Sequence, residues 1–161
     1  RHIMMWNWKL MHEDDDFILY CDIDNIVGAE EDDMGFFPSP ECYRPLPERA
    51  AVWVSIILKK EETVKAYAAR RMEAGLPAAG YEQYSHTLAL VELDAAKRLY
   101  RAIPVIDFDK EDNQLGESSL IAGGDANLVK GIEGDWSKLN TRKTSKAIRA
   151  IFRFCYPPAN E

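Results

Sequence analysis

Four carboxylates near the ends of two expected strands are the side chains best placed for acid–base chemistry. Glu92 and Asp94 close one strand, and Asp107 and Asp109 close the next. Asp107 and Asp109 are two positions apart, so they would share one face if the strand extended through both. Two carboxylates on one face can divide the roles of acid and base. Turn chemistry is nevertheless the favoured interpretation of this pair, because the polar run 109–113 follows the strand.

Two acidic clusters, at 13–16 and 30–33, offer the oxygen ligands that calcium requires. Neither cluster has the alternating spacing of a calcium loop, with its glycine and distal glutamate, so solvated loops are favoured. The glycines at 123, 124, 131 and 134 lack the Gly-Lys-Ser/Thr sequence of a phosphate loop and indicate a flexible connection. The sequence therefore predicts no metal and no cofactor.

The three histidines, His2, His12 and His86, lie far apart and without the spacing of zinc ligands. His86 could act as a general base beside Ser85 or Cys155, but no orienting third group stands at a recognisable position. A surface or edge position is the favoured interpretation of His86. No catalytic residue is therefore assigned from the sequence.

The composition indicates one folded domain over residues 1–161. Hydrophobic residues make up 47% of the chain, which is enough to form a core. The net charge of −7 repels nucleic acids and anionic membrane surfaces. No apolar run approaches the roughly 20 residues that span a bilayer. Since the sequence begins at Arg1, membrane contact is expected only through a removed N-terminal signal or lipid anchor.

Hydrophobic patterning predicts an α+β fold built on an antiparallel sheet of about six strands. The expected strands cover 4–11, 17–21, 51–58, 87–93, 99–108 and 114–121. The strand at 51–58 is rich in β-branched and aromatic residues, and it is expected at the centre of the sheet. The segment 28–48 contains four prolines and predicts a long surface loop.

Two helices are expected to complete the domain. The extra helix covers about 61–74 and ends at the Gly-Leu-Pro sequence of residues 75–77, because proline cannot continue it. The C-terminal helix covers 144–155 and is expected to pack on the sheet through an apolar face that includes Ile148 and Ile151. Trp136 is expected to hold the preceding loop onto the core.

Aromatic residues outside the expected strands allow two interpretations. Tyr81, Tyr84, Phe36 and Phe37 could form an adhesive surface, since aromatic side chains dominate protein interfaces. They could equally pack beneath their own loops. The sequence leaves both interpretations open.

Several segments in order resemble one known family. They are the tryptophan strand at 4–11 with 17–22, then 51–54, 90–94, 97–101, the turn at 107–113, Trp136, and a terminal helix ending in Cys155. This series of about 110 residues resembles the surface-adhesin protein E family of Gram-negative bacteria. The resemblance implies a curved antiparallel sheet with the C-terminal helix across it, export through the inner membrane, often lipid anchoring, and, for the best-known member, adhesion to host extracellular proteins.

The cysteines depart from the family pattern. Family members commonly have a cysteine where this sequence has Ala95, bridged to the one in the last helix, so that bridge is absent here. Cys155 could pair with Cys21 or Cys42 or remain a buried thiol. Where a bridge forms, Cys21 with Cys42 is preferred, because a closed loop of about 20 residues would restrain the proline-rich segment by about 3 kcal/mol.

We therefore expect a noncatalytic, adhesin-like binding domain in the periplasm or at the outer membrane surface. Its ligand is unknown, and its expected partner is a host extracellular protein, an envelope component or a second copy that forms a homodimer. One alternative is an accessory hydrolytic enzyme that uses the four carboxylates on the sheet. Another is a structural subunit of a cell-envelope assembly, which would expose a large apolar area on the isolated domain.

Overall fold

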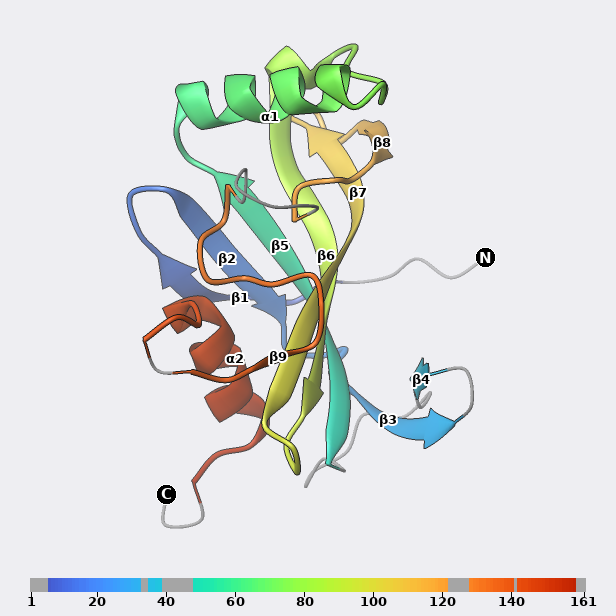
Figure 1. Cartoon of the computed structure of the whole chain (residues 1–161), viewed down its shortest axis with the longest axis vertical. Coiled ribbons are helices and arrows are strands. Elements are labelled where there is room, and N and C mark those ends of the chain that lie inside the picture. The colour runs from blue at the N-terminus through green and yellow to red at the C-terminus, as the bar shows by residue number, and fades with distance from the viewer. Residues whose placement is uncertain (1–5, 33–34, 39–47, 122–127, 141, 159–161) are drawn as a thin grey trace.

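The computed structural model of the chain shows an antiparallel sheet with two helices (Figure 1). The structure describes residues 6–32, 35–38, 48–121, 128–140 and 142–158. Helix α1 (Glu61–Glu73) lies across one end of the sheet, and helix α2 (Lys146–Cys155) lies against one face. The predicted α+β class, the extra helix and the C-terminal helix are therefore confirmed.

Six strands form the main path of the sheet in the order β1-β2-β5-β6-β7-β8, and every pairing along it is antiparallel. Their bounds are β1 Trp8–Glu13, β2 Phe17–Asp22, β5 Arg49–Leu58, β6 Tyr84–Asp94, β7 Leu99–Asp109 and β8 Gln114–Glu117. Strand β5 lies between β2 and β6, as predicted for the apolar strand. Strand β8 is shorter than the predicted 114–121, because the chain then turns inward and buries Leu120 and Ile121.

Part of the segment 28–48 forms strands, so the prediction of a loop over its whole length is wrong. Strand β3 (Val27–Asp32) pairs with β4 (Gly35–Pro38) as a hairpin, and its first two residues also pair with β5. Proline is disfavoured in the middle of a central strand except at a bulge, but it is tolerated at a strand end, and Pro38 is the last residue of β4. A short strand, β9 (Ser137–Lys138), pairs with β7.

The apolar core lies between α2 and the sheet face that it covers. Val52, Val54 and Ile56 of β5 are fully buried and alternate along the strand, so they point to the same face. Ile148 and Ile151 of α2 belong to the same buried cluster. The apolar face predicted for the C-terminal helix therefore packs on the sheet.

Local signals in the sequence define the helix ends. Gly75 follows α1 with a φ of 74°, and the Leu76 amide donates to the Arg71 carbonyl at 2.8 Å. This is the left-handed glycine stop that the sequence predicts. Helix α2 begins after Ser145, whose side chain accepts a hydrogen bond from the Ala147 amide at 3.0 Å. Neither described helix is long and apolar enough to cross a membrane.

The chain before α2 is held tightly at Gly131. The Gly131 carbonyl accepts hydrogen bonds from the Tyr100 hydroxyl at 3.1 Å and from the Ser145 amide at 2.8 Å. Gly131 has a φ of 79°, and a Cβ at this position would lie 2.5 Å from the Ser145 nitrogen. This glycine therefore marks a close crossing of two segments, and not the flexible connection that the sequence indicated.

Candidate functional site

The most concentrated set of polar side chains surrounds Asp107 of β7, which is fully buried. Tyr67 of α1 and Tyr81 donate hydrogen bonds to its Oδ2 at 2.6 and 2.7 Å. Thr87 of β6 donates to its Oδ1 at 2.6 Å. Tyr84 shares a hydrogen bond of 2.7 Å with the Thr87 hydroxyl. Three hydroxyl groups from three parts of the chain thus converge on one carboxylate.

Arg71 of α1 supplies the positive charge of this cluster. Its Nη1 lies 3.8 Å from Asp107 Oδ2, and its guanidinium carbon lies 4.4 Å from the centroid of the Tyr81 ring. The guanidinium also donates to the carbonyls of Pro77 and Glu117, both at 2.8 Å. We call the cluster the Asp107 network, and its members are Tyr67, Arg71, Tyr81, Tyr84, Thr87 and Asp107.

The Asp107 network is a polar part of the core. Burial raises the pKa of Tyr67 and of Tyr81, and the Asp107 carboxylate raises both further. Burial also raises the pKa of Tyr84 well above its ordinary value. These tyrosines therefore stay protonated and can donate hydrogen bonds at neutral pH. Each member is at most 3% exposed, so a substrate reaches the carboxylate only if the core opens.

This arrangement corrects the interpretation of Asp107 as a turn residue. It also decides between the two interpretations of Tyr81 and Tyr84, which pack inside and do not form an adhesive surface. The side chains of Phe36 and Phe37 lie outside the described part of the chain. The sequence contains one indication of the Asp107 network. Tyr67 and Arg71 are four residues apart, so they lie on the same face of α1.

The structure does not gather the predicted carboxylates into one site. Glu92 is buried and forms an ion pair with Arg101. Asp107 is the register partner of Thr87, which lies seven residues before Asp94 on β6. At about 3.3 Å per residue, Asp94 and Asp107 are about 23 Å apart. A general acid and a general base at this separation cannot act on one bond.

Turn chemistry does explain two other acidic positions. The Asp109 carboxylate accepts hydrogen bonds from the amides of Glu111 and Asn113, both at 2.9 Å, and the bond from Asn113 lowers its pKa. In the β1–β2 turn, the Asp14 carboxylate accepts from the Phe17 amide at 3.0 Å. The first acidic cluster therefore caps a hairpin. No group of three or more metal-ligating side chains occurs among the described residues.

His86 is half-buried on β6 and stacks on Phe108, with ring centroids 5.0 Å apart. Its Nδ1 lies 3.1 Å from the Ser85 hydroxyl. Burial lowers the pKa of His86, so its ring is neutral at neutral pH. Cys155 belongs to α2, on the other face of the sheet, so of the two nucleophiles only Ser85 lies beside this histidine. The exposed Asp112 carboxylate lies 3.9 Å from its Nε2.

Two of the three cysteines belong to the described part of the chain. Cys21 of β2 and Cys155 at the end of α2 are both buried in the core. Cys42 lies outside the described residues, so the pairing of Cys21 with Cys42 stays a prediction. The burial of Cys21 means that any partner must reach it inside the core.

The sheet face opposite α2 carries large apolar side chains that remain partly exposed, and we call it the open face. Trp53 and Ile57 of β5 alternate with the buried residues of that strand and point away from the core. Residues paired in register point to the same side, and Trp53 pairs with Leu90 while Ile57 pairs with His86. The open face comprises Trp6, Trp8, Leu10, Ile18, Tyr20, Trp53, Ile57, His86, Leu88, Leu90, Ile103, Ile106 and Phe108.

All four tryptophans of the chain lie on or beside the open face. Trp6 stacks on Trp8 with ring centroids 4.9 Å apart and meets the edge of Trp53 at 6.4 Å. Trp136 lies at one end of the face, where its ring stacks on the Arg101 guanidinium at 4.7 Å. Trp136 thus holds its loop through a cation–π contact, whereas the sequence predicted packing on the core.

The open face also contains a hollow of about 320 Å³. Its lining residues are Trp6, Trp8, Ser55, His86, Leu88, Phe108 and Asp112. Four of these side chains are aromatic rings, and the His86 ring is uncharged at neutral pH because burial lowers its pKa. A hollow with such walls can accept one large apolar side chain from another molecule.

Comparisons of the chain with protein-family models, curated proteins and solved structures find no match. The resemblance of the ordered sequence segments to the surface-adhesin protein E family therefore stays a prediction. Among the described residues, the Asp107 network is sealed, whereas the open face meets solvent.

Proposed function

We propose that this protein is a noncatalytic binding domain that engages a protein partner through its open face. The observation that carries the proposal is the gathering of all four tryptophans on one side of the sheet. Tryptophan and tyrosine dominate the energetics of protein interfaces because they bury a large area with few rotatable bonds. Neither described helix covers this side (Figure 1).

The pattern of β5 supports the same conclusion. Strands covered on both faces have nearly continuous apolar sequences, whereas strands covered on one face alternate. Strand β5 is apolar on both faces, yet α2 covers only the face with Val52 and Val54 and leaves Trp53 partly exposed. A partner molecule would give the second face the cover that its composition suits.

The size of the open face is sufficient for a specific contact. Five strands about 4.8 Å apart, with about six residues each at 3.3 Å, span on the order of 500 Å². Most side chains of the open face are half-buried, and Trp6 and Leu10 are exposed, so the apolar area that meets solvent is smaller than this outline. Contiguous exposed apolar patches of about a few hundred Å² mark interaction sites. A standard interface buries about 800 Å² per partner, so residues around the open face would complete it.

The proposal includes the location that the segment resemblance implies, which is the periplasm or the outer membrane surface. The partner is then a host extracellular protein, an envelope component or a second copy. A structural subunit would bind its neighbour through the same face. The difference is that the partner of an obligate subunit stays bound and keeps the face covered. The accessory-hydrolase alternative has less support, since Asp94 and Asp107 are about 23 Å apart along the strands.

Site-specific photo-crosslinking in the native cell tests the proposal. A photoreactive side chain at Leu10, which is 50% exposed on the open face, should give one discrete protein adduct. The same group at Met72, which is 70% exposed on α1, is the matched control and should give none. Trp6→Ala removes a ring that lies before β1, so it should abolish the adduct without unfolding the domain.

Each outcome of the crosslinking experiment is decisive. An adduct from Leu10 that contains two copies of the chain identifies a homodimer, and one with another protein identifies the partner. A partner that co-purifies with the domain at full occupancy without irradiation favours the structural subunit. Equal labelling from Leu10 and Met72, or none from either, overturns the proposal.

Cell fractionation tests the location separately. The full-length precursor should sit in the periplasm or outer membrane. Thiol labelling of the unfolded chain, with and without reductant, then shows whether Cys21 and Cys42 are protected as a pair. A cytosolic protein whose three thiols all react once it is unfolded would refute export and leave only the binding surface.

A further inference from the structure

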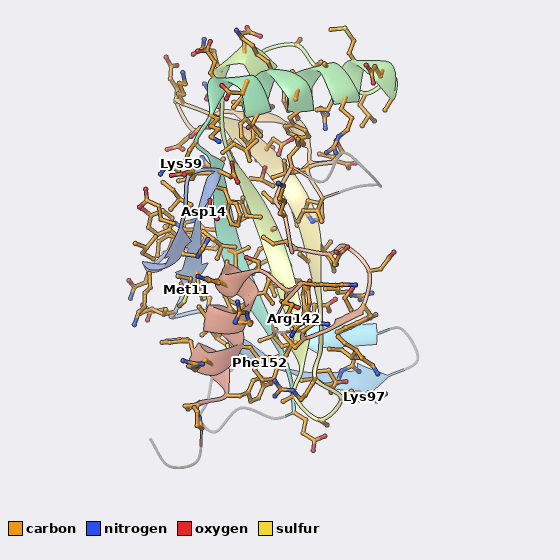
Figure 2. The ribbon with its side chains drawn as sticks, turned by 60° about the vertical axis from the view of Figure 1, so that its left-hand side comes forward. Met11, Asp14, Lys59, Lys97, Arg142 and Phe152 are labelled. Atoms are coloured by element: carbon orange, nitrogen blue, oxygen red, sulfur yellow. The ribbon has the colours of Figure 1, made fainter. Side chains whose placement is uncertain are left out.

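A second surface lies on the α2 side of the sheet, opposite the open face. It is a pocket of about 430 Å³ whose walls include Arg98, Arg149, Phe152, Arg153 and Tyr156. Arg149 and Arg153 are one helical turn apart, and so are Phe152 and Tyr156, while Arg98 comes from the β6–β7 turn. Figure 2 shows Phe152 on α2, at the same end of the molecule as that turn. We call this site the arginine pocket.

The charge of the arginine pocket is unlike that of the chain as a whole. The chain has a net charge of −7, yet three guanidinium groups and no carboxylate line the pocket. Arg71 and Arg101 each contact a carboxylate elsewhere in the fold. Among the described residues, no acidic side chain forms an ion pair with Arg98, Arg149 or Arg153. Within the described part of the chain, the pocket therefore concentrates positive charge that no carboxylate neutralises.

One donor of the pocket is buried without an acceptor. The Nε of Arg149 is shielded from solvent and has no hydrogen-bond partner among the described residues. Leaving a buried donor unsatisfied destabilises the folded state, so such groups are rare in folded proteins. A change in the conformation of the Arg149 side chain would bring this donor to an anionic oxygen in the pocket, and that oxygen would gain from the charge of the guanidinium.

The remaining walls are aromatic. The rings of Phe152 and Tyr156 lie 5.3 Å apart between centroids, and the Arg98 guanidinium lies 5.3 Å from the Phe152 centroid. This arrangement puts a flat apolar wall directly beside a cationic one. A ligand that fits both walls has an anionic group attached to an aromatic or alkyl group.

We propose that the arginine pocket binds a small organic anion, a carboxylate or a phosphate ester with an apolar group. The volume of about 430 Å³ lies within the range of small-molecule sites. The guanidinium groups of Arg149 and Arg153 hold the anionic oxygens, and the Phe152 and Tyr156 rings contact the apolar group. This site is independent of the open face, since the two lie on opposite sides of the sheet.

Amide chemical shifts of the isotope-labelled chain provide the assay. Phenyl phosphate and benzoate are the two anionic probes, benzylamine is the cationic control, and benzyl alcohol is the neutral control. The anions should shift amides of α2 and of the β6–β7 turn, saturating at millimolar concentration, and their ranking separates phosphate from carboxylate recognition. The two controls should produce no saturable shift at these amides, because neither supplies an anionic oxygen.

Three variants test the assignment of residues. Arg149→Gln should weaken binding about tenfold or more, since a hydrogen bond to a charged group is lost. Arg98→Gly removes a guanidinium from a position with φ of 54°, where glycine carries no backbone strain, so it should weaken binding without loss of stability. Arg142→Gln is the control, because Arg142 is exposed and outside the pocket lining, and it should leave binding unchanged.

Several results would overturn the proposal. They are the absence of a saturable shift with either anion, shifts centred away from α2, equal shifts with benzylamine, and equal weakening by Arg142→Gln and Arg149→Gln. Trp6→Ala serves to separate the two sites. It should leave the phenyl phosphate titration unchanged even where it abolishes partner crosslinking, so either proposal can fail while the other stands.

Discussion

Replacement of Asp107 by Asn is the sharpest test of how the core is organised. Asn keeps the shape of the side chain but removes its charge and one of its two acceptor oxygens. Tyr67, Tyr81 and Thr87 donate to this carboxylate at 2.6, 2.7 and 2.6 Å. Arg71, which is 2% exposed, would lose its nearest counter-charge while staying buried. The variant therefore weakens all of these contacts to Asp107 at once.

The size of the effect follows from these contacts. A hydrogen bond to a charged group contributes about 1.5–3 kcal/mol, and removing one partner of a buried ion pair costs about 3–5 kcal/mol. The contributions overlap, and the hydroxyl groups can rotate to meet the remaining oxygen of Asn. We therefore expect a loss of about 3–5 kcal/mol in the free energy of unfolding, which is a large part of the 5–15 kcal/mol typical of a domain.

Equilibrium unfolding in urea, followed by tryptophan fluorescence, measures this loss as a lower midpoint at an unchanged slope. Asp109→Asn is the matched control, because Asp109 lies two residues away and its carboxylate accepts hydrogen bonds from backbone amides of a turn. The control should cost less than about 1 kcal/mol, since Asn also accepts turn hydrogen bonds. If Asp107→Asn costs no more than Asp109→Asn, the network does not stabilise the core as argued.

Two further perturbations test other parts of the fold. Gly131→Ala should cost about 3 kcal/mol or more, because φ is 79° and the new Cβ would lie 2.5 Å from a backbone nitrogen. Gly134→Ala, whose Cβ would meet its nearest atoms at 3.6 Å, should cost less than about 1 kcal/mol, and equal melting temperatures would contradict the close crossing. The pKa values of Tyr67, Tyr81 and Tyr84 are raised in the folded state, so the unfolded chain loses these protons first as the pH rises. Stability should therefore be unaffected by these groups below about pH 10 and fall above it, and ultraviolet absorbance should show them ionising only as the domain unfolds.

Several features of the fold could be predicted because their causes are local. The apolar run at 51–58 identified the central strand, and the left-handed glycine at Gly75 identified the end of α1. The hairpin of β1 and β2 followed from alternation on both sides of an acidic turn. In each of these cases, the interacting residues are neighbours along the chain.

The candidate sites could be predicted only in part. The aromatic strand at 4–11 was recognised, but the sequence did not show that its tryptophans meet Trp53 on one uncovered face. Arg98 and Arg149 belong to different segments, so no spacing in the sequence joins them in a pocket. The hairpin of β3 and β4 was missed because the prolines of this segment outweighed its short apolar stretch.

By itself, the sequence determined the α+β class, the order of the elements and the faces that alternate along them. Only the tertiary structure decided that Asp107 and Arg71 meet inside the core, that Tyr81 and Tyr84 are buried, and that one side of β5 stays open. The physical reason is the range of the interactions. Periodicity and turn chemistry act within a few residues, whereas the bond from Tyr67 to Asp107 joins positions 40 residues apart. Partners at that separation are chosen by the packing of the whole chain.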